Sequence, residues 1–86
     1  MTWQAYVLPE GFDAGFFCKY IRTTEKLTQP VLAKRLGISG GTLSRVENRK
    51  KPASLELKVA LGSVFRNELK DPEFVHGYQR FVATST

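Results

Sequence analysis

The stretch LTQPVLAKRLGISGGTLSRVENRKKP, residues 27–52, contains two short segments with helical apolar spacing, separated by a turn that carries glycine. Thr28 suits the N-cap of the first segment, and Pro30 is tolerated in a first helical turn, where the missing N–H has no partner anyway. Apolar residues then share one face of a helix over 29–36: Leu32, Ala33 and Leu36. Gly37 ends this helix, because glycine accepts the positive φ of a C′ position.

The second segment begins at Ser39, a good N-cap, and is expected to end near Asn48. Leu43 and Val46 supply only a narrow apolar edge, so most of this helix should face outward. A short helix, a glycine-containing turn and a second helix with a polar outer face describe a helix-turn-helix.

The charge of the chain is concentrated in the same stretch. The formal net charge is +5. Residues 1–26 hold three acids and three bases, and residues 52–86 hold four of each, so both segments sum to zero. Residues 27–51 hold one acid, Glu47, and six bases: Lys34, Arg35, Arg45, Arg49, Lys50 and Lys51. An excess confined to one supersecondary unit indicates a polyanionic partner.

Three further segments follow an N-cap residue and carry apolar residues at helical spacing: 14–25 after Asp13, 55–66 after Ser54, and 72–83 after Asp71. In the first, Phe17 and Ile21 share a face with either Cys18 or Tyr20. The N-terminal TWQAYVL is aromatic and β-branched and could form a short strand or an arm. We therefore expect a single all-α domain of five helices.

Several classes of protein are disfavoured. Cys18 is the only cysteine, which excludes a disulfide within the chain and favours a buried, inert thiol. Ligands for a metal, a catalytic residue set and a phosphate-binding loop are not evident, so we expect no metal, no cofactor and no enzyme activity. The chain shows no signal peptide and no apolar run long enough to cross a bilayer, so we expect a cytoplasmic protein with no membrane partner.

The residues quoted above resemble the lambda-repressor/Cro (XRE-type) DNA-binding family. The match includes LTQ, the following LA, the LGIS turn, the RVEN end of the second helix and a basic run before proline, all in order and spacing. The resemblance spans about residues 17–65. It implies a lambda-repressor-like domain with a core over 13–66. The chain adds residues 1–12 before this core, which we expect to form an N-terminal arm or strand, and residues 70–86 after it, which we expect to form a C-terminal dimerisation helix.

The resemblance also implies roles for individual residues. The second helix would lie in the major groove of double-stranded DNA. Arg45 is the strongest candidate for reading a base, since its planar fork matches the acceptors of guanine. The full set of base-reading candidates is Gly40, Gly41, Thr42, Ser44 and Arg45. The candidates for phosphate contact are Thr28, Gln29, Ser39, Asn48, Arg49, Lys50 and Lys51. Lys34 and Arg35 are weaker candidates.

Two positions depart from the family pattern. Family members usually carry longer polar side chains where this chain has Gly40 and Gly41. These glycines either allow the helix N-terminus to approach DNA closely or reflect a tight turn at the helix entry. Arg49 stands where the family often has glycine, and it is expected to extend the helix or to add a phosphate contact beside Asn48.

A structural ion pair is implied between Arg22 and Glu47. In the family, the matching residues form a largely buried salt bridge between the first helix and the end of the recognition helix. The pair would set the angle of the recognition helix, so loss of Arg22 should act on folding.

The last helix carries apolar residues beyond the family core: Phe74, Val75, Tyr78, Phe81 and Val82. A chain of 86 residues buries a modest fraction of its surface, which favours a homodimer built on these residues. Two recognition helices about 34 Å apart would then match a pseudo-palindromic operator. The alternative is that this helix folds back and completes the core of the monomer.

The sequence thus predicts a sequence-specific DNA-binding transcriptional regulator, most simply a homodimeric repressor. Three alternatives keep the same fold: an antitoxin that also binds a toxin protein, a controller protein of a restriction–modification system, and a phage or plasmid regulator. A protein-interaction module is the alternative outside DNA binding.

Overall fold

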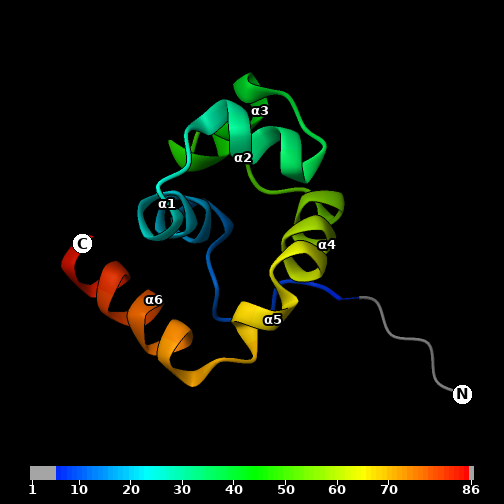
Figure 1. The fold of residues 1–86 in the computed structure, drawn as a ribbon. Coiled ribbons are helices and arrows are strands. Elements are labelled where there is room, and N and C mark those ends of the chain that lie inside the picture. Colours follow the sequence, from blue (N-terminus) through cyan, green and yellow to red (C-terminus); the bar gives the residue numbers. More distant parts are fainter. Residues whose placement is uncertain (1–5, 86) are drawn as a thin grey trace, which may run out of the picture.

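The computed structural model describes residues 6–85 and contains six helices, with no β-strand in that part of the chain (Figure 1). The helices are α1 (Ala14–Glu25), α2 (Gln29–Leu36), α3 (Gly40–Glu47), α4 (Leu55–Val64), α5 (Arg66–Leu69) and α6 (Pro72–Ser85). The all-α class is confirmed. No helix among the described residues has the length and apolar character needed to span a membrane.

α1 is the central helix of the fold and packs against α2, α3 and α6 (Figure 1). Its inner face carries Phe17, Cys18 and Ile21, each fully buried. The sequence left open whether Cys18 or Tyr20 joins this face, and the structure buries Cys18 while Tyr20 lies at the boundary with α6. Leu32, Leu43 and Leu61 complete the core from α2, α3 and α4.

The predicted helix over 55–66 is broken in two. At Phe65 the backbone leaves helical geometry, with φ −109° and ψ 26°, and α5 follows as a separate turn. The break directs the Phe65 ring into the core, where it is 2% exposed and lies edge-on to Phe17. Burial of an aromatic ring is a tertiary effect that helical spacing alone could not predict, so the expected count of five helices was wrong.

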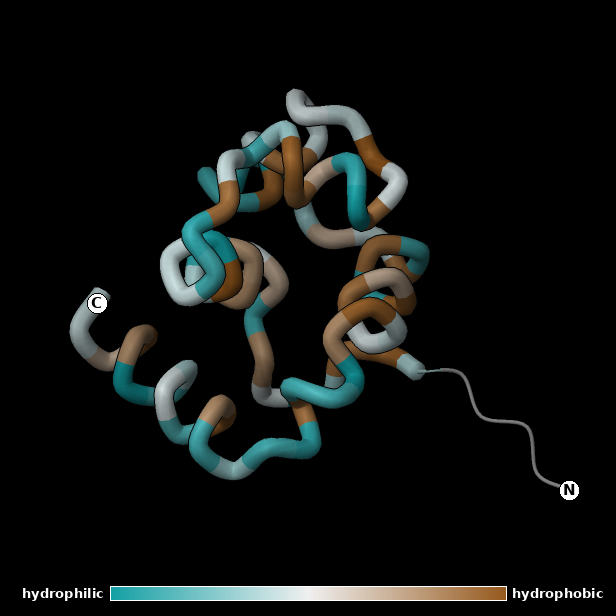
Figure 2. Tube along the Cα trace, in the orientation of Figure 1, coloured by the Kyte–Doolittle hydropathy of each residue, from teal (hydrophilic) through white to brown (hydrophobic). Residues whose placement is uncertain are grey.

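α4 carries apolar residues on two sides, and it has the most hydrophobic colouring of the helices in Figure 2. Leu57 and Leu61 face the core, whereas Leu55 and Val64 are exposed. Part of its surface is covered by the chain before α1, and this close passage requires Gly62. A Cβ at Gly62 would lie 2.6 Å from the carbonyl carbon of Val7.

The described part of the N-terminal region, residues 6–12, forms an arm and not a strand. Leu8 is buried, and its N–H donates a 2.9 Å hydrogen bond to the carbonyl of Lys58 on α4. The Arg66 guanidinium lies 4.7 Å from the centre of the Tyr6 ring, which holds the arm against α5. Residues 1–5 of the predicted arm or strand lie outside the described residues.

α6 folds back onto α1 and completes the core of one chain, which is the second of the two arrangements that the sequence left open. Tyr78 is 4% exposed and packs against the rings of Phe12, Phe17 and Tyr20. Its assignment to a dimer interface is therefore wrong, because one chain already buries it. Two other members of that set, Phe74 and Val82, are partly buried against the same core.

Gly77 permits the close approach of α6 to α1. A Cβ at this position would collide with the hydroxyl of Tyr20. That hydroxyl donates a 3.1 Å hydrogen bond to the carbonyl of Phe74, so the two helices are joined by a polar contact as well as by aromatic packing.

Candidate nucleic-acid interface

α2 and α3 form a helix-turn-helix with a three-residue turn, residues 37–39. Gly37 takes φ 71°, and Ile38 donates a 3.0 Å hydrogen bond to the carbonyl of Ala33. This arrangement satisfies the last carbonyls of α2. The side chain of Thr28 accepts from the N–H of Val31 at 3.4 Å, so the predicted N-cap of α2 is confirmed.

α3 separates a buried face from an exposed one. Leu43, Val46 and Glu47 are buried. The base-reading candidates lie on the rest of the helix: Gly40, Gly41 and Arg45 are exposed, and Thr42 and Ser44 are half-buried. The structure therefore brings these five candidates together on one short helix.

Arg45 is the only cation on the exposed face of α3. Its side chain makes no hydrogen bond or ion pair with any residue between 6 and 85. An exposed guanidinium without a carboxylate partner keeps all five of its N–H donors available to an external acceptor.

Short hydrogen bonds connect the hydroxyl and amide groups of α3. Ser39 caps the helix by accepting from the N–H of Thr42 at 3.1 Å, and its hydroxyl donates to Thr42 Oγ1 at 2.8 Å. At the other end, Asn48 Nδ2 donates to Ser44 Oγ at 3.3 Å. These contacts orient the side chains but leave Thr42 and Asn48 each with a further N–H or O–H donor.

Gly40 and Gly41 are not required by the rest of the chain. A Cβ at either position would meet nothing within 4 Å, and neither residue has a positive φ. The explanation by a tight turn is therefore wrong, since the turn geometry falls on Gly37. Glycine inside a helix costs roughly 0.5–1 kcal/mol relative to alanine. Nothing within residues 6–85 offsets this cost at either position.

The predicted pair of Arg22 and Glu47 is present. Arg22 Nε and Nη2 donate to the two carboxylate oxygens of Glu47 at 2.9 and 2.7 Å, and the Glu47 side chain is 1% exposed. A bidentate pair of this kind fixes both distance and angle between two helices. It holds the end of α3 against α1, next to the close contact between Gly15 and the carbonyl of Val46.

Gln29 completes this buried network. Its Nε2 donates to Glu47 Oε1 at 3.1 Å, so a residue expected to contact phosphate ties the start of α2 to the end of α3. A side-chain amide has two N–H donors, and the second remains available. Gln29 is half-buried at the edge of the network.

Arg49 does not extend α3, contrary to one of its two expected roles. Asn48 is the C-cap, and Arg49 takes φ 60°, the conformation that glycine adopts most readily. Its guanidinium lies 3.1 Å from Asp13 Oδ2 and 4.6 Å from the centre of the Phe16 ring. Arg49 is therefore turned toward α1.

Most of the remaining cations of the stretch 27–51 have no acidic partner among the described residues. Arg35 pairs with Glu25 at 3.4 Å. Among the described residues, no acidic partner is found for four cations of the stretch 27–51: Lys34, Arg45, Lys50 and Lys51. Because the one acid, Glu47, is buried in its pair with Arg22, the exposed charge is all positive.

Asp13 has a larger role than the sequence suggested. It was expected only as the N-cap of α1, and it does accept from the N–H of Phe16 at 3.0 Å. It also pairs with Arg49, and its own N–H donates to Tyr78 Oη at 2.8 Å. Its partners lie 36 and 65 residues away in sequence, so no local pattern could have indicated them.

Comparison with protein-family models, with curated proteins and with solved structures finds no match to this chain.

Proposed function

We propose that this protein is a sequence-specific double-stranded DNA-binding regulator of the lambda-repressor/Cro type, and that α3 is its recognition helix. The observation that carries the proposal is the exposed face of α3, which presents Arg45, a cation without an ion-pair partner among residues 6–85. The opposite face of α3 is fixed by the buried contacts of Glu47. A rigid helix with a free guanidinium is suited to reading base edges.

In this proposal, each part of the surface has its own task. Arg45 donates to the acceptors of a guanine, and Ser44 and Thr42 contact neighbouring groups. Lys50 and Lys51 contact phosphates, which supply affinity without sequence preference. Gly40 and Gly41 carry no side chain, so they allow the start of α3 to approach the DNA closely.

The proposal includes a homodimer on a pseudo-palindromic operator. α3 has eight residues, so a single copy reads few base pairs. A two-fold dimer would place two such helices about 34 Å apart on one side of the duplex. With Tyr78 buried, two apolar residues of the predicted set remain for this contact, the half-buried Val75 and Phe81, and the Phe81 ring also lies 5.6 Å from the ring of Tyr20.

The experiment is a selection of bound duplexes from a random pool, followed by affinity measurements on the selected site. We expect Arg45→Ala to lose about 1–3 kcal/mol on the selected site and much less on unrelated DNA. Arg80→Ala is the matched control, because it removes the same charge from an exposed position on α6. A pool without enriched sequences, or an equal loss in both variants, would overturn the proposal.

A further inference from the structure

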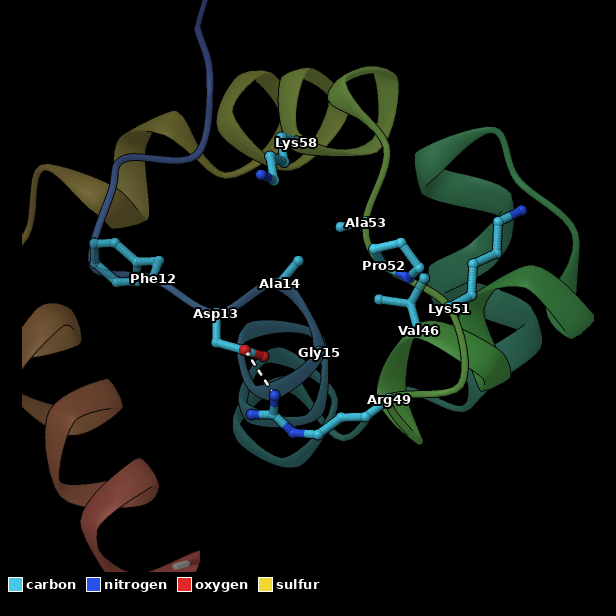
Figure 3. Close-up of a pocket in the computed structure, with 10 residues that line it drawn as sticks. All are labelled: Phe12, Asp13, Ala14, Gly15, Val46, Arg49, Lys51, Pro52, Ala53 and Lys58. Atoms are coloured by element: carbon cyan, nitrogen blue, oxygen red, sulfur yellow. Dashed lines mark ion pairs between the residues drawn. The ribbon is translucent and has the colours of Figure 1, made fainter.

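A cavity of about 460 Å³ opens between the start of α1, the loop from α3 to α4, and α4 itself (Figure 3). Its apolar lining comes from four separate parts of the chain: Phe12 of the arm, Ala14 of α1, Val46 of α3, and Pro52 and Ala53 of the loop. In Figure 3 the side chains of Ala14 and Val46 face the space enclosed by these parts. The volume lies within the usual range for small-molecule sites.

The lining of the cavity also includes charged side chains, and two of them, Asp13 and Arg49, already form an ion pair with each other. Arg49 reaches below Gly15 to its ion pair with Asp13, at 3.1 Å (Figure 3). The Lys51 side chain points away from the other labelled residues. These two cations are therefore poorly placed for a ligand in the cavity.

Lys58 is the cation that remains. Figure 3 shows its side chain extending from α4 toward the side where Phe12 and Ala14 lie. Its ammonium group makes no hydrogen bond or ion pair with any described residue, although its backbone carbonyl accepts from Leu8. The cavity thus combines apolar side chains in its wall with one uncommitted ammonium group.

We propose that this cavity binds a small organic monocarboxylate. The apolar body of the ligand rests on Ala14, Val46 and Ala53, and its carboxylate accepts a hydrogen bond from Lys58 Nζ. A single available ammonium matches a single negative charge, whereas a phosphate dianion would require several donors. This site does not depend on DNA binding, so it can be tested on the protein alone.

The test is a titration of the ¹⁵N-labelled full chain, followed by its backbone amide signals. The probes are phenylacetate and indole-3-acetate, each compared with its neutral primary amide. We expect at least one acid to shift the signals of residues 12–15 and 51–53 in a saturable manner. Its amide should bind at least about tenfold more weakly, because the amide cannot form the hydrogen bond between charged groups.

Two variants locate the site. Lys58→Gln should weaken binding of the acid by about tenfold or more, whereas Lys70→Gln, a matched control at an exposed lysine before α6, should leave it unchanged. Ala53→Leu should block the cavity in a folded protein, since Ala53 is half-buried at its edge. Far-UV circular dichroism confirms that each variant is folded.

Three results would contradict the proposed carboxylate site. The proposal is overturned if neither acid causes a saturable shift up to about 10 mM, where a ligand of this size should bind. It is also overturned if Lys58→Gln binds as the unmutated protein does. Equal shifts from inorganic phosphate at matched ionic strength would show that the site responds to charge alone, which contradicts the role of the apolar side chains in the wall.

Discussion

Tyr78 Oη accepts a 2.8 Å hydrogen bond from the backbone N–H of Asp13, a residue 65 positions earlier in the chain. Asp13 is the N-cap of α1 and the partner of Arg49, which directly follows the C-cap of α3. The contact therefore connects α6 to the two helices that position the candidate DNA-binding surface. Tyr78 belongs to the structure that supports this surface.

Tyr78→Phe tests this contact with little change in shape. We expect a loss of about 1 kcal/mol in the free energy of unfolding, because the N–H of Asp13 loses its acceptor while the ring stays packed. For a domain of this size that corresponds to a decrease in Tm of roughly 4–8 °C. Tyr6→Phe, at an exposed tyrosine, is the control and should change Tm by much less. An unchanged Tm for Tyr78→Phe would contradict the assigned role.

Arg22→Met removes one partner of the buried ion pair. The Glu47 carboxylate would then keep only the hydrogen bond from Gln29 in a site that is 1% exposed. We expect a loss of about 3–5 kcal/mol in urea denaturation, and recovery of part of it in the double variant Arg22→Met, Glu47→Leu. If Arg22→Met keeps the free energy of unfolding of the unmutated protein but binds DNA with a changed base preference, Arg22 instead takes part in reading the bases.

Gly40→Ala and Gly41→Ala should separate stability from binding. Each should raise the free energy of unfolding by about 0.5–1 kcal/mol, because alanine favours the helix and its Cβ has open space in the protein. On the selected DNA site each should reduce affinity, since the added methyl group separates α3 from the duplex. Variants that gain stability and keep full affinity would show that the glycines have no role in approach.

Lys50→Ala and Lys51→Ala should change the salt dependence of DNA binding. Removal of one phosphate-binding cation should reduce the slope of log K against log salt by roughly 0.9. Arg49→Ala is the informative comparison, because the Arg49 guanidinium is held by Asp13 and the Phe16 ring. We expect Arg49→Ala to lower stability and leave the slope unchanged. A slope reduced equally by all three variants would assign Arg49 to phosphate after all.

Stability should decrease in alkaline solution. Burial, with a smaller contribution from the Glu47 carboxylate, raises the pKa of the Cys18 thiol from 9.0 to about 12, and burial also raises the pKa of Tyr78 above 10.0. In this pH range the unfolded chain loses these protons first, so stability present below about pH 9 is lost as pH rises toward 12. Urea denaturation between pH 7 and pH 11 measures the loss, and Cys18→Ala should make it smaller. The same slope in Cys18→Ala would exclude a contribution from Cys18.

The features that the sequence predicted well are local ones. The N-caps Asp13, Thr28 and Ser39 accept hydrogen bonds from the residues three positions ahead, because capping depends on a few adjacent residues. The start of every predicted helix and the glycine turn at Gly37 follow from the same short-range chemistry.

The features that it did not predict depend on contacts between distant segments. The break at Phe65 depends on where Phe17 lies, and the direction of Arg49 depends on Asp13. In the same way, the apolar face of α6 was predicted correctly, but its spacing could not decide between a second subunit and α1 as its partner.

The place of Tyr78 in the fold has a consequence for synthesis on the ribosome. The complete helix-turn-helix leaves the exit tunnel before α6 does, yet its core still lacks the ring that packs on Phe12 and Phe17. The nascent chain therefore exposes an aromatic surface until α6 emerges. The core around the start of α1 is therefore complete only when α6 has closed over it.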